Sequence, residues 1–189
     1  MTVNMSPTSK LQSIGSSAFS NCFSLESIFV PANVKSISDS SFSNCKSLTT
    51  VVIATGVTSI GQSAFSQCRL LSSVTIPSTV SSIGSNAFYQ CRLLSSVTIP
   101  TGVTSIGQSA FYQCISLSSI TIPSGVTSID SYTFYQCSSL RTVTIPASVV
   151  TIGNFSNFYL HHYFNLNHYR LLCILWVSNH LYKLGPFYI

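Results

Sequence analysis

Six of the seven cysteines in this sequence recur at one spacing, and regularly spaced thiols suggest either disulfides or a metal site. They stand 23 residues apart, at Cys22, Cys45, Cys68, Cys91, Cys114 and Cys137. In stacked repeats their Cα–Cβ bonds would run parallel, which holds the Cβ atoms about 5 Å apart instead of the ~3.8 Å of a disulfide. No Cys-x-x-Cys or Cys/His spacing typical of zinc lies inside the repeats. We therefore predict a column of buried free thiols, with no metal or other cofactor.

Acid–base catalysis has few groups available. The only carboxylates are Glu26, Asp39 and Asp130, and all four histidines follow residue 160, at no spacing that supports a metal site. No Ser/His/Asp set, phosphate-binding loop or carboxylate pair can be assembled from the repeats. The sequence therefore argues against an enzyme.

The charge pattern excludes further classes of protein. Charged residues make up 6% of the chain, against roughly 25% in a typical soluble domain. The eight Lys and Arg residues stand singly, so no basic cluster can neutralise several phosphates and we expect no nucleic-acid partner. No apolar run approaches the ~18 residues of a membrane-spanning helix, so we expect no transmembrane segment. The first residues show no signal peptide or anchor.

The elements that position these residues are repeats with the period of the cysteines. Phenylalanines and leucines recur at the same interval, and RLLSSVTIP occurs identically at 69–77 and 92–100. A fixed period of this length is typical of a solenoid. Six full repeats and a partial seventh span residues 8–152, with a flank at 1–7 and a non-repeat, aromatic-rich tail at 153–189.

One unit predicts a strand, a bend and a tight turn. Val74 and Ile76 lie on one side of an extended segment, and Ser73 and Thr75 on the other. Pro77 ends the strand because it has no N–H. The spacing in NAFYQC (86–91) predicts one short helical or 3-10 turn. Stacked units would pair their strands into one continuous parallel sheet and share one core.

The strand pattern L-x-x-V-x-I-P resembles the L-x-x-L-x-L of leucine-rich repeats. With I-G-x-x-A-F-x-x-C before it, the unit resembles the BspA-like leucine-rich-repeat proteins over residues 8–152. The resemblance implies a curved leucine-rich-repeat slab and surface proteins that bind host or extracellular-matrix proteins without catalysis. It also implies a cell-surface or secreted location, with a cytoplasmic location as the alternative.

In such a slab the outward strand residues lie on the concave sheet, where leucine-rich repeats generally dock partners. We predict that a protein partner binds the hydroxyls there: Ser73, Thr75, Ser96, Thr98, Ser119, Thr121, Thr142 and Thr144. A solvated sheet face, with Thr chosen for β propensity, is the alternative. Lys46, Arg69 and Arg92 share one position beside the strands and would attract an acidic partner, unless they merely reflect duplication. The sequence does not indicate the oligomeric state or the identity of the partner.

Three further features carry expectations. Amides at one repeat position, from Asn21 to Gln136, would hydrogen-bond from coil to coil, and Tyr89, Tyr112 and Tyr135 would stack beside them. Phe29 and Val52 replace Thr on the sheet face and form either a small adhesive patch or tolerated exposure. The tail from Gly153 is either a cap over the last coil or non-native sequence. The chain thus reads as a protein-binding or adhesion module, with an intracellular scaffold or a truncated, non-functional fragment as alternatives.

Overall fold

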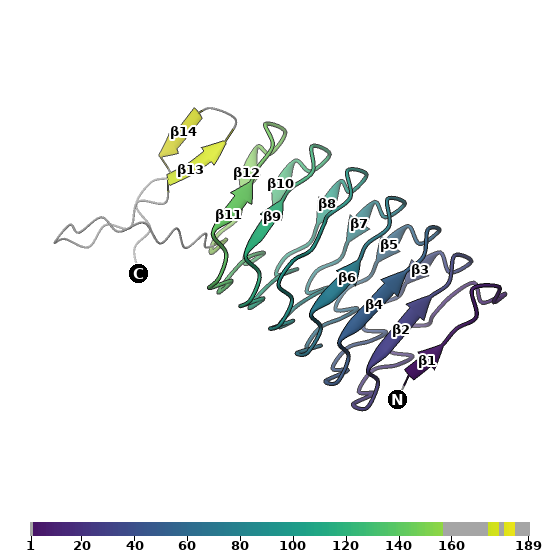
Figure 1. Cartoon of the computed structure of the whole chain (residues 1–189). Coiled ribbons are helices and arrows are strands. Elements are labelled where there is room, and N and C mark those ends of the chain that lie inside the picture. The colour runs from purple at the N-terminus through teal and green to yellow at the C-terminus, as the bar shows by residue number, and fades with distance from the viewer. Residues whose placement is uncertain (1, 157–173, 178–179, 184–189) are drawn as a thin grey trace.

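The computed structural model describes residues 2–156, 174–177 and 180–183, and within 2–156 the chain winds as a parallel β-solenoid (Figure 1). Most coils contribute a strand to one row and a two-residue strand to a second row. Paired residues are mostly 23 positions apart, as in Val51 with Val74 and Ile60 with Ile83. The predicted solenoid class and period are confirmed.

The first row of strands divides into two sheets. Its four-stranded part contains β1 (Thr2–Asn4), β2 (Ser27–Val30), β4 (Thr50–Ile53) and β6 (Ser73–Thr75). Its two-stranded part contains β9 (Ser119–Thr121) and β11 (Thr142–Thr144). Residues 94–100, between the two parts, form no strand. The expectation of one continuous sheet is therefore wrong at this coil, although its sequence is identical to that around β6.

The second row is divided in the same way. Its four-stranded part contains β3 (Ser36–Ile37), β5 (Ser59–Ile60), β7 (Ser82–Ile83) and β8 (Ser105–Ile106). β10 (Ser128–Ile129) pairs with β12 (Thr151–Ile152). Beyond the solenoid, β13 (Ile174–Val177) and β14 (His180–Lys183) pair antiparallel.

A glycine position explains the division of the second row. Gly61, Gly84, Gly107 and Gly153 each donate a backbone hydrogen bond to the preceding coil, of 2.7–2.9 Å. A Cβ at Gly107 would lie 2.5 Å from the Ser85 nitrogen, so a larger residue cannot approach as closely. Asp130 occupies this position at the break, and in the described chain its amide makes no such bond.

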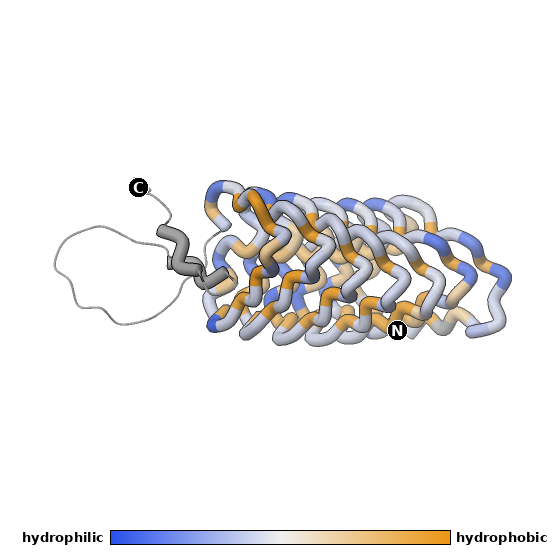
Figure 2. Tube along the Cα trace, turned by 90° about the horizontal axis from the view of Figure 1, so that it is seen from above, coloured by the Kyte–Doolittle hydropathy of each residue, from blue (hydrophilic) through white to orange (hydrophobic). Residues whose placement is uncertain are grey.

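The core consists of columns of identical side chains. Phe42, Phe65, Phe88, Phe111 and Phe134 are fully buried, as are two further columns of the same coils, Leu48, Leu71, Leu94 and Leu117 and Val57, Val80, Val103 and Val126. Rings of successive phenylalanines stack with centroids 5.2–5.7 Å apart. Apolar positions accordingly recur at matching places from coil to coil in Figure 2. One unit could not bury these side chains alone, so the stack provides the core.

The segment before each cysteine is a series of turns, and the predicted helical or 3-10 turn is wrong, because the described residues contain no helix. Between residues 86 and 91, the backbone amides of the odd-numbered residues donate to the carbonyl three residues earlier. Those of the even-numbered residues donate to carbonyls of the next coil. Asn86 and Gln90 have φ of 57°, in the left-handed region that a type II turn requires at its third residue. A helix would use all of these amides internally. We call 84–91 and its equivalents the turn side.

At the N-terminal end, β1 extends the first sheet from within the flank at 1–7. Thr2 pairs with Ser27, so this coil is two residues longer than the others. The division of the chain at residues 7 and 152 stays a prediction. The expectation that the tail caps the last coil falls largely outside the described residues.

Candidate functional site

The predicted hydroxyl residues lie on one face of the solenoid, which we call the Ser/Thr face. Ser73 and Thr75 lie on β6, and Val74 between them points into the core. The same alternation holds in β9, and in β11 the residue between the two hydroxyls is half-buried; Thr121 pairs with Thr144. All eight predicted positions are exposed: Ser73, Thr75, Ser96, Thr98, Ser119, Thr121, Thr142 and Thr144.

The hydroxyls of the Ser/Thr face differ from those beside it in their hydrogen bonding. None of the eight has a hydrogen-bond partner within the described part of the chain. By contrast, the neighbouring Ser72 and Ser118 hydroxyls donate to the Thr49 and Ser95 carbonyls, at 3.2 and 3.3 Å. The eight hydroxyls therefore keep both donor and acceptor capacity for an external partner.

The structure does not unite all eight residues in one sheet. Ser96 and Thr98 lie in the 94–100 segment, where no strand is formed, while the other six lie on paired strands. Within the described residues, one backbone bond joins this segment to the next coil, from Ser118 to Ser95, and a second, from Ser116 to Arg92, lies just before it, each 3.2 Å. The Ser/Thr face thus has two parts on paired strands, an ordered half on β9 and β11 and a second half on β6. A less tightly bonded coil separates them.

The face becomes apolar towards the N-terminal end, where Phe29 on β2 pairs with Val52 on β4. Val52 is 42% exposed, and Phe29 is half-buried. The predicted apolar pair is therefore real, but it presents one open aliphatic side chain and one that is partly covered.

Beside the sheet, the three predicted cations are exposed and differ in their contacts. The ammonium group of Lys46 lies 4.9 Å from the centroid of the Phe23 ring, a cation–π contact. The guanidinium groups of Arg69 and Arg92 have no hydrogen-bond or ion-pair partner in the described chain. Both arginines remain available to an anionic partner.

Sequence reasoning missed the apolar residues that accompany these cations. Leu70 and Leu93 directly follow the two arginines and are 44% and 46% exposed, while Phe23 is 50% exposed. Ile115 follows at the next coil with 39% exposure. The signal was present, because Leu70 and Leu93 stand where Ser occurs in the other repeats.

The thiol column is mostly buried in the core. The Sγ atoms of five cysteines donate to the carbonyl of a phenylalanine 26 residues earlier, at 3.0–3.3 Å. All six repeat cysteines are free and five are buried. Burial raises the pKa of Cys91 and Cys114 well above the ordinary thiol range and that of Cys137 to about 12. The predicted burial is confirmed for five of the six cysteines, and at neutral pH Cys91, Cys114 and Cys137 stay protonated and unreactive.

The turn side carries two ladders of side chains. Asn44 donates to Asn21 at 2.6 Å, and Gln90 donates to Gln113, which donates to Gln136. The Tyr89 and Tyr112 rings stack at 4.6 Å, and Tyr112 and Tyr135 at 5.1 Å. These predicted coil-to-coil contacts are confirmed, although the amide ladder is interrupted at Gln67. Because these groups bond to one another, they offer less to a partner than the Ser/Thr face does.

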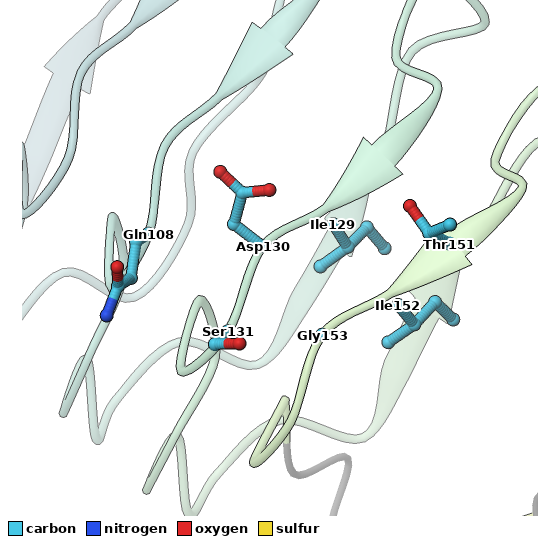
Figure 3. Close-up of a pocket in the computed structure, with 7 residues that line it drawn as sticks. All are labelled: Gln108, Ile129, Asp130, Ser131, Thr151, Ile152 and Gly153. Atoms are coloured by element: carbon cyan, nitrogen blue, oxygen red, sulfur yellow. The ribbon is translucent and has the colours of Figure 1, made fainter.

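A shallow hollow of about 330 Å³ lies where the second row of strands is divided (Figure 3). Gln108, Asp130, Ser131 and Thr151 line it, together with Ile129, Ile152 and Gly153. Asp130 is its only carboxylate, and the described residues contain no group of three metal-ligating side chains. The hollow lies beside the missing ladder bond of Asp130.

Comparisons with known proteins identify a family of proteins with this repeat. The model of the BspA type leucine-rich-repeat region matches residues 2–93 and 58–169, with six copies. The chain belongs to this family. Leucine-rich repeats generally form protein-interaction modules, and this repeat family is typically non-enzymatic. No curated protein sequence matches the chain significantly.

Solved bacterial structures share the fold of this BspA-type protein. A leucine-rich-repeat protein of T. pallidum has a TM-score of 0.77 and 28% identity, over 80% of this chain and 72% of that one. One from Bacteroides ovatus has a TM-score of 0.66 and 32% identity, over 82% of this chain but only 48% of that one. A leucine-rich cell surface protein of Faecalibacterium prausnitzii has a TM-score of 0.53 and 29% identity, over 80% and 56%. Within the described residues, no helix is long and apolar enough to cross a membrane.

Proposed function

We propose that this BspA-type protein is a binding or adhesion module that docks a protein partner on its Ser/Thr face. The observation that carries the proposal is the row of exposed hydroxyls with no partner in the described chain, six of the eight held on strands whose other side is the core. Such groups are already fixed in position, so a partner that hydrogen-bonds to them loses little conformational entropy.

The ordered half of the face, on β9 and β11, is the best candidate for the centre of the interface. Thr121 and Thr144 are paired across the two strands, and Ser119 and Thr142 lie two residues before them on the same side. The four hydroxyls form a compact set on one small sheet. Thr98 lies on the adjacent, unpaired segment and would extend the contact.

A cell-surface location fits an adhesion module, and one structural neighbour is named as a cell surface protein. The rival is an intracellular scaffold of the same fold. Antibody staining of intact and permeabilised cells distinguishes the two, because a surface protein is labelled without permeabilisation and a scaffold only after it. Exclusive labelling after permeabilisation would contradict surface display, while leaving protein binding open.

Substitution of face residues tests the docking site. Replacement of Thr98 and Thr121 by Trp, singly and together, should abolish capture of the partner because bulky side chains prevent close approach, while the unfolding midpoint stays unchanged. Reversal of Arg69 and Arg92 to Glu should slow association more than it speeds release. The matched control replaces Tyr89 and Tyr112 on the turn side by Ser. If the control loses binding and the Thr98 and Thr121 variants keep it, the partner binds the turn side and the proposal is wrong.

A further inference from the structure

One line of exposed side chains along the edge of the slab combines positive charge with apolar surface. It lies on the turns that lead from the cysteines into the first row of strands, with one turn from each of four successive coils. We call it the edge ridge, and its residues are Phe23, Lys46, Arg69, Leu70, Arg92 and Leu93. The next coil continues its apolar character through Ile115.

The charges of the edge ridge are not neutralised within the described chain. Arg69 and Arg92 occupy equivalent positions in adjacent coils, so their like charges repel, and neither has a hydrogen-bond or ion-pair partner there. Lys46 is held over Phe23, which orients it along the same line. A partner with carboxylates opposite these cations would remove the repulsion and gain bidentate contacts to the guanidinium groups.

The apolar residues of the edge ridge narrow the choice of partner. Each arginine is followed directly by a leucine whose side chain is nearly half exposed. A sulfated sugar would use the cations and leave the leucines in water. A bilayer surface fits poorly, because half-covered side chains cannot reach the ~5–10 Å into the headgroup and acyl boundary at which interfacial apolar groups bury. Side chains of a protein partner can cover leucines and reach arginines together.

The repeat distance matches one regular element in particular. Equivalent phenylalanine rings in successive coils are 5.2–5.7 Å apart. An α-helix advances about 5.4 Å per turn, so a helix lying along the stack would present one turn to each coil. Carboxylates at i, i+4 and i+7 on its face would then meet Arg92, Arg69 and Lys46 in order, and apolar residues beside them would meet Leu93 and Leu70.

We propose that the edge ridge binds an acidic amphipathic helix of a protein partner, aligned with the solenoid axis. This inference rests on the proposed function and specifies one class of partner for it. The helix binds along the edge, next to the Ser/Thr face, and the remainder of the partner extends over that face. The unpaired arginines provide the attraction, and the leucines provide contact that a purely acidic segment would lack.

A designed peptide tests the proposal on the full chain. The probe is a fluorescent helical peptide of about five turns, with Glu in one row and Leu in the adjacent row of the same face. Its control has the same composition with Glu distributed around all faces. We expect the first peptide to bind about tenfold more tightly than the control, with an affinity that falls as salt is raised.

Variants of the chain locate the binding. The double variant R69E/R92E should lower the affinity for the designed peptide by at least about tenfold, and L70S/L93S should lower it by about fivefold. The matched control K10E/K35E makes the same charge change at two exposed cations on the side of the second row of strands and should bind like the parent. Equal loss in K10E/K35E would mean that net charge alone drives binding and would overturn the proposal.

Two further probes distinguish the other occupants. Phosphatidylserine vesicles and a sulfated oligosaccharide are added to the parent chain, each at the salt concentration of the peptide measurement. One outcome would overturn the helix proposal and assign the edge ridge to one of these ligands. In that outcome the parent binds the ligand, R69E/R92E abolishes that binding, and the parent binds the two peptides equally well. If instead the peptide behaves as expected while the Thr98 and Thr121 variants still capture the native partner, the edge ridge stands and docking on the Ser/Thr face fails.

Discussion

The turn side and the Ser/Thr face belong to the same coils but are held together differently. On the turn side, alternate backbone amides bond to the next coil, and phenylalanines, cysteines, amides and tyrosines line up in columns. On the Ser/Thr face the strands lose their pairing at residues 94–100, and the hydroxyls bond to nothing in the described chain. Cohesion between coils is therefore greater on the turn side, and unused hydrogen-bonding capacity is greater on the face.

This difference suggests how the two sides share their roles. Residues that stack on the equivalent residues of neighbouring coils stabilise the fold, because a substitution there alters the packing of the coils before and after. Exposed strand residues have no such role, so they can change without loss of the fold. A repeat protein that holds its coils together through one side leaves the other side free to vary for binding.

The largest effect should come from the centre of the turn side. Phe111→Ala removes a fully buried ring between Phe88 and Phe134 and should lower the free energy of unfolding by about 3–5 kcal/mol. Urea unfolding followed by circular dichroism measures it. Ser119→Ala on the Ser/Thr face is the control and should change the value by less than about 0.5 kcal/mol. Similar midpoints for the two variants would show that the turn side does not carry the stability.

Alkaline pH should weaken the turn side through its thiols. Burial raises the pKa of Cys137 from 9.0 to about 12. The folded state therefore keeps a proton that the unfolded state releases above pH 9, so stability is complete below that pH and is lost as pH rises towards 12. Each pH unit in this window should cost about 1.4 kcal/mol for this thiol.

The alkaline effect is measured by urea unfolding at pH 8 and pH 10. The parent should lose about 1.4 kcal/mol more between these pH values than Cys137→Ala does. Ser119→Ala should lose as much as the parent. An equal loss in the parent and in Cys137→Ala would mean that this thiol is accessible to ionisation in the folded chain.

Much of this architecture could be predicted from the sequence because identical residues recur at one spacing. The period identifies the coils, and the apolar positions within it identify the buried columns of Phe, Leu and Cys. The division of the second row was also encoded, because Asp130 replaces glycine where a Cβ at the equivalent Gly107 would meet backbone atoms. The exposed hydroxyls followed from the alternation of strand residues.

Other features could not be predicted because they depend on neighbours and not on local sequence. The segments 69–77 and 92–100 are identical, yet only the first contains a strand. The turns at 86–91 have helical spacing of apolar residues, but half of their amides bond to the adjacent coil. The exposure of Leu70 and Leu93 is also a property of the folded edge. Periodicity within one unit carries no information about bonds between units.

Hydrogen exchange compares the identical segments directly. The amides of Ser96, Val97 and Thr98 should exchange about tenfold faster than those of Ser73, Val74 and Thr75, because only the latter lie on a paired strand. Val97 and Val74 are each 8% exposed, so burial does not account for the difference. Phe88 and Phe111, whose amides bond to the next coil, serve as slow references on the turn side. Equal rates in the two segments would remove the distinction between the paired strand and the unpaired segment.

The smallest effect should come from closing the break in the second row by Asp130→Gly. Without a Cβ, residue 130 can approach the preceding coil as Gly107 and Gly153 do, and donate a backbone bond to the carbonyl of Ile106. A hydrogen bond contributes about 0.5–1.5 kcal/mol, and the added freedom of glycine in the unfolded chain costs about 0.5–1 kcal/mol. The net change in unfolding free energy should therefore stay below about 1 kcal/mol, while exchange at the residue 130 amide slows by about tenfold.

Ser38→Gly, at the other non-glycine position of this column, should behave alike, because the Ser38 amide also makes no ladder bond to the preceding coil. Unchanged exchange in both variants would show that the coils are separated by something other than the side chain at this position.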